Sequence, residues 1–313
     1  MVVNTLSKNF NYFFKRLNPS PSFVQKAARE HENIRALIEN PNGYASILSP
    51  KCFLQGSYKQ DTAIDTINDI DIVVLCELWQ PGSGGFGTKT WSRDEIFNTI
   101  AAPLFADGRY RDKVRYHESS MCIKVDLGIK VEILPVVYKQ GNTDATQEPF
   151  RLYRPEKQIW EDGYARYHQQ LLTWKNSMQK TGGNFKPAIK VFKHLRSQYN
   201  VDAVSFHIEC LLFALPDYVF LGNPVEYITK ILNYIAKYSA DEWYKTDVKT
   251  PCGERNIFTE SEWNLGSWYV FHKLVQHWAK YANIAYTAKD VGVAIEAWQI
   301  LLGENYFPKV VAV

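Results

Sequence analysis

The chain has 313 residues, of which 46% are hydrophobic and 22% are charged, and this composition is typical of a globular protein with a substantial core. The formal net charge of +3 is too small to predict general binding of long DNA or RNA, whereas a small anionic substrate such as a nucleotide is compatible with it. The five cysteines are odd in number and lack a CxxC spacing, which disfavours a disulfide framework or a zinc site. The sequence has no apolar run of membrane-spanning length and no signal-peptide pattern, so we expect a cytoplasmic protein with reduced thiols.

The first 61 residues are expected to form two helices, a short strand and the start of a third helix. Apolar spacing predicts a short helix within residues 1–20 and a second helix from Ser22 to a break at residues 40–43. A short strand is expected from Cys52 to Leu54. The glycine-serine turn at Gly56 and Ser57 follows it, and Ser57 or its neighbour should open a short helix whose exposed amides attract phosphate.

The next strand carries two carboxylates at its start. The apolar run from Ile70 to Leu78 predicts burial on both faces beyond the first residues. Because residues i and i+2 of a strand point to the same face, Asp69 and Asp71 should project together while Ile70 enters the core. Two parallel carboxylates on a rigid strand are suited to a hard divalent cation such as Mg²⁺.

A glycine-rich segment at residues 80–90 contains the pattern GxGxxG, from Gly82 to Gly87. The following helix begins later, at a capping box formed by Ser92 and Glu95. The last glycine therefore does not open a helix, as a dinucleotide-binding fingerprint requires. We expect a mobile surface loop there.

A third carboxylate is expected on a hairpin of two strands at residues 121–125 and 129–137, which turns near Gly128. Glu132 lies on the polar face of the second strand and is the favoured candidate. Asp126 is a rival, but it falls at the turn, where aspartate is common for conformational reasons. Pro135 suggests that the second strand is ending or lies at a sheet edge.

Helices are expected throughout the part of the chain after Pro155. Apolar spacing and turn residues place them at residues 163–179, 187–199, from Ser205, 224–238, 263–282 and 288–302. Lys186, Lys190 and Lys193 share one side of the second of these helices, and spacing alone indicates an ordinary solvated basic face.

These motifs together resemble a known group of enzymes. Gly56-Ser57, Asp69-x-Asp71 and a strand carboxylate followed by Leu134-Pro135 are similar to the signature of the DNA polymerase β-like nucleotidyltransferase superfamily. Residues 189–195 (IKVFKHL) and 205–209 (SFHIE) resemble the C-lobe of the cyclic GMP-AMP synthase and oligoadenylate synthase group. The ending, residues 297–308, is similar to that of bacterial members. The chain thus resembles the CD-NTase family, the bacterial cyclic-oligonucleotide synthases of anti-phage CBASS systems.

The resemblance implies a bilobed α/β (α+β) fold with a small mixed sheet and an α-helical C-terminal lobe. The expected domains are an N-terminal helical segment bridging both lobes (1–45), the catalytic core (46–155) and the helical lobe (156–313). The active site would lie in the cleft between the lobes.

The resemblance also assigns roles to individual residues. Two Mg²⁺ ions, with Mn²⁺ as a possible replacement, would be held by Asp69, Asp71 and Glu132, where the family usually has aspartate at the third position. The residues expected to bind substrate are Gln55, Gly56, Ser57, Lys190, Lys193, Ser205 and Phe206. Lys193, with Lys190 second, would contact the triphosphate, and the Phe206 ring would stack on a nucleobase.

The implied reaction joins NTPs, ATP among them, into a cyclic di- or trinucleotide that a separate CBASS effector reads. We expect a monomer without membrane or long nucleic-acid partners, and an accessory regulatory protein is left open. One alternative is template-independent nucleotide transfer to RNA or protein, which the weak net charge disfavours for RNA. The other is a non-catalytic nucleotide-binding homologue, whose only support is glutamate at position 132.

Overall fold

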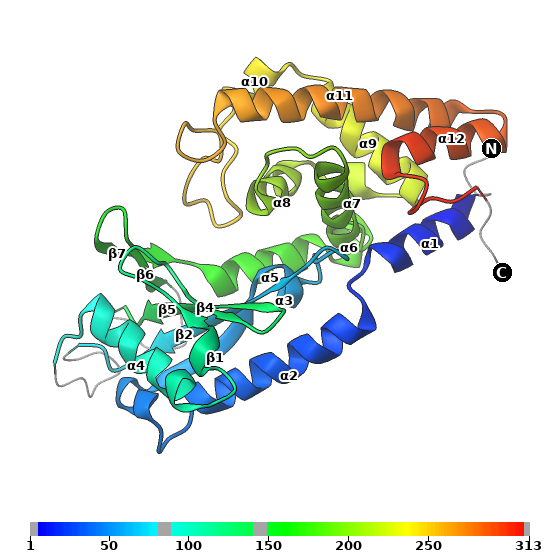
Figure 1. The fold of residues 1–313 in the computed structure, drawn as a ribbon. Coiled ribbons are helices and arrows are strands. Elements are labelled where there is room, and N and C mark those ends of the chain that lie inside the picture. Colours follow the sequence, from blue (N-terminus) through cyan, green and yellow to red (C-terminus); the bar gives the residue numbers. More distant parts are fainter. Residues whose placement is uncertain (1–5, 81–88, 140–148, 310–313) are drawn as a thin grey trace. The chain divides into compact units, whose positions relative to one another are not determined.

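The computed structural model describes residues 6–80, 89–139 and 149–309. Two compact units divide the chain (Figure 1). The α/β unit comprises residues 20–61 and 66–169, and the helical unit comprises residues 1–19, 62–65 and 170–313. The glycine pattern at residues 82–87 lies outside the described residues.

The strands of the described α/β unit form one mixed seven-stranded sheet in the order β1-β2-β5-β4-β3, with β6 pairing with β5 and β7. The strands are β1 (Pro50–Gln55), β2 (Asp69–Cys76), β3 (Val114–Arg115), β4 (Ile123–Asp126), β5 (Lys130–Val137), β6 (Phe150–Arg154) and β7 (Ile159–Gly163). Strands β2 and β5 are parallel, and the other pairs are antiparallel. The predicted hairpin is confirmed as β4 and β5.

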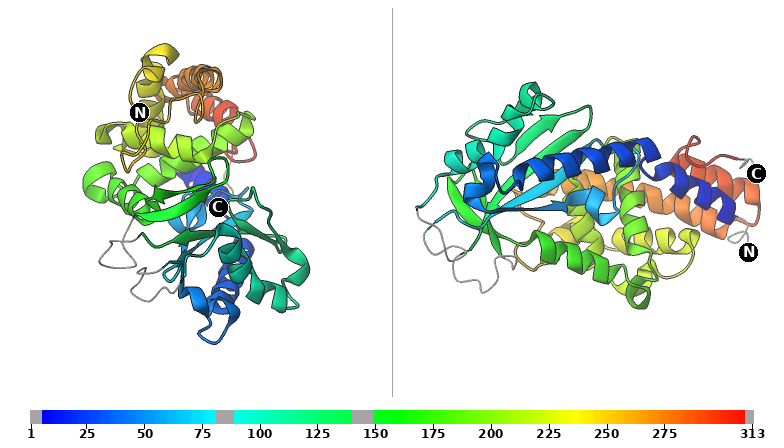
Figure 2. Two further views of the ribbon diagram at one scale, coloured as in Figure 1. Left: turned by 90° about the vertical axis from the view of Figure 1, so that its left-hand side faces the viewer. Right: turned by 90° about the horizontal axis from the view of Figure 1, so that it is seen from below.

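Helices α2 (Pro21–Ile38) and α4 (Arg93–Ala106) pack against this sheet, and Figure 2 shows α2, in blue, beside β1 and β2. Ser20 caps α2 by accepting a hydrogen bond from the Phe23 amide, and the predicted capping box of Ser92 and Glu95 begins α4. The short elements of the unit are η2 (Tyr44–Leu48), α3 (Gly56–Gln60) and η4 (Arg111–Lys113). Helix α5 (Ala165–Lys175) contains the boundary between the two units.

Two features of the sheet differ from the sequence-based prediction. Pro135 lies in the central strand β5, and on one side of that strand it falls between the residues that pair with β4 and those that pair with β6. On this side, the partner of β5 changes from β4 to β6 at Pro135, so the missing N–H of the proline removes no hydrogen bond between paired residues. Strand β5 continues past Pro135 and is not an edge strand. The hairpin β6–β7 was missed, because only helices were expected after Pro155. The cross-strand pair of Tyr153 and Trp160, with ring centroids 5.4 Å apart, stabilises this hairpin.

The helical unit is built around buried aromatic side chains. Its elements are α1 (Ser7–Leu17), α6 (Met178–Thr181), α7 (Phe185–Gln198), α8 (Ser205–Ala214), η5 (Asp217–Phe220), α9 (Pro224–Ala236), α10 (Ala240–Tyr244), α11 (Leu265–Thr287) and α12 (Val291–Leu302). Helix α11 packs on α9 and α12. Phe10 of α1 packs edge-on against Trp298 and Phe307, with ring centroids 5.0 Å apart in each pair.

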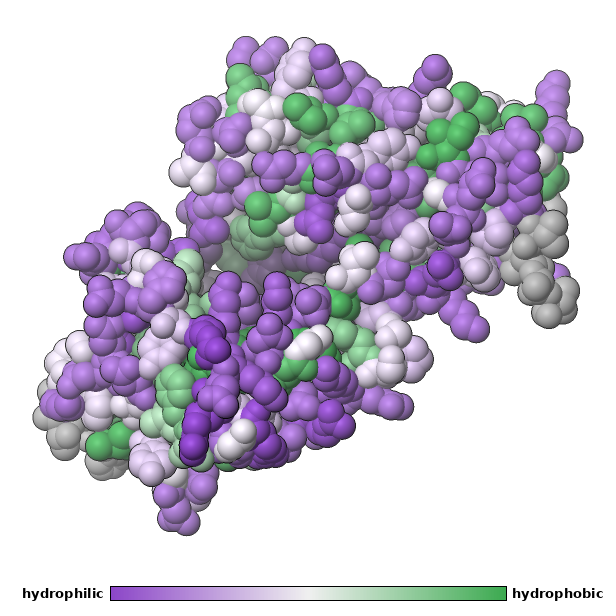
Figure 3. Space-filling model, viewed as in Figure 1, coloured by the Kyte–Doolittle hydropathy of each residue, from purple (hydrophilic) through white to green (hydrophobic). Residues whose placement is uncertain are grey.

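The surface of the molecule is mainly hydrophilic on the face drawn in Figure 3, with small separate hydrophobic areas. None of the described helices combines the length and the hydrophobicity needed to cross a bilayer. All five cysteines are free thiols, as expected.

Candidate active site

A row of polar side chains crosses three neighbouring strands of the α/β unit. Asp71 of β2 is paired in register with Gln55 of β1 on one side and with Glu132 of β5 on the other. Side chains that are directly paired across strands project from the same face of the sheet. Asp69 is exposed and Asp71 is half-buried, whereas Ile70 between them is fully buried. The predicted alternation at the start of this strand is confirmed.

Gly56 lies directly against the carboxylate of Asp71. Its φ of +73° is in the left-handed region, and a Cβ added there would come within 1.7 Å of Asp71 Oδ2. Glycine is therefore required for two reasons, the backbone conformation and the close approach of the carboxylate. The glycine-serine turn and the carboxylate strand form one local arrangement, although 15 positions separate Gly56 from Asp71 in the sequence.

Ser57 is the second residue of α3, because the helix begins at its neighbour Gly56. Gln55 occupies the N-cap position without a side-chain cap, so the serine does not cap the helix. Within the described residues, no hydrogen bond involves the Ser57 hydroxyl and no hydrogen bond or ion pair involves the Asp69 carboxylate. Both groups are consequently available to a ligand.

Glu132 has two neighbours that the sequence analysis did not include. Lys124 Nζ lies 3.3 Å from Glu132 Oε1, and this hydrogen bond raises the pKa of the lysine. The Cys122 thiol also hydrogen-bonds to Glu132, and burial, with the carboxylate charge adding to it, raises the pKa of Cys122 to about 11. The contact of Lys124 with Glu132 could have been predicted from the sequence, because a hairpin centred on Gly128 pairs these two residues.

Asp126, the rival third carboxylate, has a local role. It is the last residue of β4, and its Oδ1 accepts a hydrogen bond from the Gly128 amide at 3.0 Å. This contact stabilises the hairpin turn, which is the conformational role that the sequence suggested.

The donor set fits Mg²⁺ by chemistry, because all the ligands are carboxylate oxygens. Within the described ranges, however, no group of three or more His, Cys, Asp or Glu side chains is arranged to hold a metal ion. The three predicted carboxylates thus do not form a complete metal cage, and Glu132 is instead ion-paired with Lys124. Mg²⁺ is usually held by one or two carboxylates together with substrate phosphates, and Asp69 and Asp71 are the two carboxylates that would hold it.

The helical unit holds the other predicted site residues. Lys193 is buried, and its Nζ donates to Glu209 Oε1 at 2.7 Å and to the carbonyl and hydroxyl oxygens of Thr62 at 3.3 and 3.2 Å. Lys190 is also buried and donates to Asn18 Oδ1 at 2.9 Å. Neither lysine belongs to a solvated basic face, so that interpretation of their spacing is wrong. Their contact with a triphosphate stays a prediction.

Ser205 and Phe206 begin helix α8, as predicted. The Ser205 hydroxyl accepts a hydrogen bond from Arg196 Nη1 at 2.8 Å. The guanidinium of Arg255 lies 5.5 Å from the centre of the Phe206 ring, a cation–π contact.

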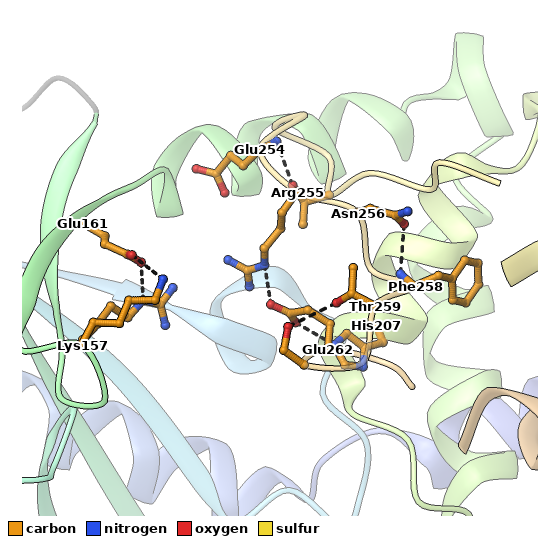
Figure 4. Close-up of polar contacts among 12 residues, drawn as sticks. Lys157, Glu161, His207, Glu254, Arg255, Asn256, Phe258, Thr259 and Glu262 are labelled. Atoms are coloured by element: carbon orange, nitrogen blue, oxygen red, sulfur yellow. Dashed lines mark hydrogen bonds and ion pairs between the residues drawn. The ribbon is translucent and has the colours of Figure 1, made fainter. Parts of the chain in front are cut away.

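Arg255 is oriented by a chain of contacts that Figure 4 shows. Its Nε lies 2.7 Å from Glu262 Oε1, and the other oxygen of Glu262 contacts His207 Nε2 at 3.1 Å. The His207 ring is in turn stacked on Trp263. Arg255 and Glu262 were missed because they lie in the long connection between α10 and α11, which carries no motif.

Family models match both parts of the chain. The model of the Second Messenger Oligonucleotide or Dinucleotide Synthetase domain matches residues 4–176, more than half of the chain. The model of the cGAS/DncV-like nucleotidyltransferase C-terminal helical domain matches residues 172–281.

Similar proteins agree with these matches. A cyclic UMP-AMP synthase of Rhodothermus marinus is 25% identical over 234 residues, which are 67% of this chain and 78% of that protein. Vibrio cholerae DncV, a cyclic AMP-GMP synthase, has a similar structure with a TM-score of 0.68, 11% identity and 97% coverage of both chains. Escherichia coli MS115-1 CdnC, solved with ATP, has a TM-score of 0.66, 16% identity and coverage of 96% and 98%. The chain therefore belongs to the CD-NTase family of second-messenger oligonucleotide or dinucleotide synthetases and is a nucleotidyltransferase with the polymerase β-like fold.

Proposed function

We propose that this enzyme joins two or three NTPs into a cyclic oligonucleotide by metal-dependent attack of ribose hydroxyls on α-phosphates. The observation that carries the proposal is the contact between Gly56 and the Asp71 carboxylate, beside a Ser57 hydroxyl and an Asp69 carboxylate for which the described residues supply no partner. A phosphate-binding turn and cation-binding carboxylates are thereby brought together, as transfer from an NTP requires.

In the first step the ribose hydroxyl oxygen of one NTP forms a bond to the α-phosphorus of another. The bond from that phosphorus to pyrophosphate breaks, and pyrophosphate leaves with its electron pair. The proton of the attacking hydroxyl passes to Glu132, which lies in register with Asp71. A second attack within the linear product, or after one further addition, closes the ring.

The chain's own residues supply positioning and charge. Asp69 and Asp71 would hold Mg²⁺, or Mn²⁺ in its place, which neutralises phosphate charge and favours ionisation of the attacking hydroxyl. The Ser57 hydroxyl and the Gly56 amide are suited to the donor phosphates. The other residues that would contact the substrate are Gln55, Lys190, Ser205 and Phe206.

The product would serve as a second messenger in CBASS anti-phage signalling, released in the cytoplasm and bound by a separate effector protein. The support is membership of a family of second-messenger synthetases. ATP is the first substrate to test, because E. coli CdnC was solved with ATP.

The test is incubation of the purified protein with all four NTPs and Mg²⁺ or Mn²⁺, followed by phosphatase treatment and mass analysis. A phosphatase-resistant cyclic product that disappears in Asp69→Asn/Asp71→Asn is the expected result. Asp112→Asn, an exposed carboxylate on η4 of the same unit, is the matched control and should keep full activity. Linear products on added RNA would favour transfer to RNA, and NTP binding without turnover would identify a non-catalytic homologue.

A further inference from the structure

A row of five polar side chains crosses the sheet of the α/β unit from β1 to β3. The strand register pairs each member with the next, in the order Gln55, Asp71, Glu132, Lys124 and Arg115. Because paired side chains project from one face of a sheet, all five lie on the same face. The charges change along the row, from a neutral amide through two carboxylates to two basic groups. The row therefore has a basic end, which lies beyond the proposed metal site.

The basic end of the row points away from the hydrophobic core. Val114, which precedes Arg115 in β3, is buried, and so are Ile123 and Val125, which flank Lys124 in β4. Successive side chains of a strand alternate between its faces, so Arg115 and Lys124 lie on the face opposite this core. Both residues are exposed, and the Lys124 side chain is 63% exposed. An anion from the solvent can therefore reach both groups.

Lys124 and Arg115 are like charges placed directly opposite each other on neighbouring strands. Such a pair destabilises a sheet unless another charge compensates it. Lys124 has a carboxylate partner, because its Nζ lies 3.3 Å from Glu132 Oε1. Arg115 Nη1 donates to the Val114 carbonyl at 2.7 Å, and no carboxylate of the described residues forms an ion pair with Arg115. The positive charge at this end of the row is thus only partly compensated by the described protein.

We propose that Lys124 and Arg115 bind the triphosphate of the acceptor NTP, the nucleotide whose ribose hydroxyl attacks. The proposal rests on the proposed function, in which that hydroxyl gives its proton to Glu132. The 5′-triphosphate leaves the ribose on the side away from the 2′ and 3′ hydroxyls, so it can extend along the row toward β3. Neighbouring strands are about 5 Å apart, which places Lys124 about 5 Å and Arg115 about 10 Å from Glu132 along the row. Arginine and lysine are the side chains best suited to phosphate.

The donor NTP would use the other end of the row. Gly56 follows Gln55 in the chain and lies against the Asp71 carboxylate, and its amide and the Ser57 hydroxyl are suited to the donor phosphates. Two triphosphates repel each other strongly when they are held close together. A separate basic site for the acceptor keeps them on opposite sides of Asp71 and Glu132 and lowers this repulsion. The row thus orders the donor phosphates, the cation, the proton acceptor and the acceptor phosphates across the sheet.

The first test compares ATP with adenosine as labelled acceptors, because these differ only in the triphosphate. The donor is 2′,3′-dideoxy-ATP in saturating excess, which lacks both ribose hydroxyls and cannot act as an acceptor. In Arg115→Gln the ratio of kcat/KM for ATP to kcat/KM for adenosine should fall about tenfold, since a charge-assisted contact with phosphate is lost. Lys124→Gln should also lower this ratio. Arg115→Lys keeps the positive charge and should keep most of the ratio.

Arg29→Gln is the matched control for the first test. The Arg29 side chain is 66% exposed and lies on α2, whose buried residues belong to the core on the opposite face of the sheet. The ratio should not change in this variant. Added salt should lower the ratio more in the wild-type protein than in Arg115→Gln, because exposed charges are screened. An equal fall of kcat/KM for ATP and for adenosine in Arg115→Gln would overturn the proposal, since the residue would then not act through the acceptor phosphates.

The second test requires no turnover. Lysines of the metal-free protein are acetylated with and without inorganic tripolyphosphate, and the modified peptides are quantified by mass analysis. Tripolyphosphate should slow acetylation of Lys124 several-fold in the wild-type protein and much less in Arg115→Gln. Lys157 is the internal control, because its side chain is 57% exposed in the same unit and is likewise paired with a carboxylate, that of Glu161. Its acetylation should not depend on tripolyphosphate.

The two tests separate this proposal from the proposed function. If the wild-type chain transfers no nucleotide, the proposed function fails, and acetylation of Lys124 still shows whether the two basic residues bind phosphate. Acetylation of Lys124 that is equal with and without tripolyphosphate would overturn the phosphate site. If nucleotide transfer occurs and the ratio is unchanged in Arg115→Gln, the acceptor site is overturned even where tripolyphosphate protects Lys124.

Discussion

Two groups of charges predicted to serve one site differ in their surroundings. Asp69 on the sheet is exposed and has no partner within the described residues, and the side chain of Glu132 is 34% exposed. The Lys193 side chain in the helical unit is 4% exposed, and its ammonium donates to three oxygens, two of Thr62 and one of Glu209. Charges of the first kind can bind a cation or phosphate at little cost, whereas a charge of the second kind holds the chain together. Exposure therefore separates the charges that can bind a ligand at little cost from those that are already paired within the protein, more clearly than residue type does.

The largest expected effect concerns the exposed group. Glu132→Gln removes the proposed proton acceptor but keeps the size of the side chain, and kcat should fall by about 10²- to 10⁴-fold. Glu132→Asp keeps a carboxylate and should stay within about tenfold of the wild-type rate, since only its reach changes. Single-turnover rates of the two variants with ATP measure the difference. An equal fall of kcat in both variants would show that the length of the Glu132 side chain matters, and that the residue does not accept the proton.

Replacing the buried Lys193 should lower the stability of the protein. Lys193→Met leaves the Glu209 carboxylate without its buried ammonium, and the free energy of unfolding should fall by about 3–5 kcal/mol. Urea denaturation followed by tryptophan fluorescence measures this loss, and replacing both residues with Met and Leu should restore most of it. A loss below about 1 kcal/mol in the single variant would place the pair with ordinary surface ion pairs.

Gly56→Ala tests the contact between the turn and the strand. A Cβ would clash with Asp71 Oδ2 and would occupy a left-handed backbone conformation, so nucleotide transfer should fall about 100-fold. The strain should cost about 1–3 kcal/mol of stability. Gly108→Ala is the matched control, because a Cβ there meets no atom within 4 Å. A fully active Gly56→Ala variant would mean that Asp71 need not approach the turn during the reaction.

The smallest effect is expected from Lys124→Met. The pair of Lys124 with Glu132 is mostly exposed, and its loss should change the free energy of unfolding by less than about 1 kcal/mol. Lys51→Met offers a comparison, since its partner Glu77 is only 11% exposed and its removal should cost more. Chemical denaturation of both variants measures the contrast.

Local patterns in the sequence predicted the arrangement of the strands around Asp69, Asp71 and Glu132 well. The alternation at Asp69, Ile70 and Asp71 and the polar face of β5 both follow from the two-residue period of a strand, and the structure has both. The capping box at Ser92 and the hairpin at Gly128 are likewise set by neighbouring residues. Such features need no knowledge of distant contacts.

Features that depend on distant parts of the chain could not be predicted in the same way. The spacing of Lys190 and Lys193 indicated a solvated face, but their partners, Asn18, Thr62 and Glu209, come from separate parts of the sequence. Lys193 is 131 positions from Thr62, and no local pattern reports that contact. The hairpin β6–β7 was missed because its turn at residues 155–158 begins with Pro155, and a proline also suits the start of a helical region.

The packing of Phe10 against Trp298 and Phe307 has a consequence for the order of folding during synthesis. The Asn9 side chain also donates a hydrogen bond to the Pro308 carbonyl, 299 positions away, so this part of the core of the helical unit cannot close until residues 298–308 have left the ribosome. The sheet and its helices end at residue 169 and can form earlier. We therefore expect the packing of Phe10 against Trp298 and Phe307 to form late, in a slow step that truncation after Leu302, which removes Phe307 and Pro308, would weaken.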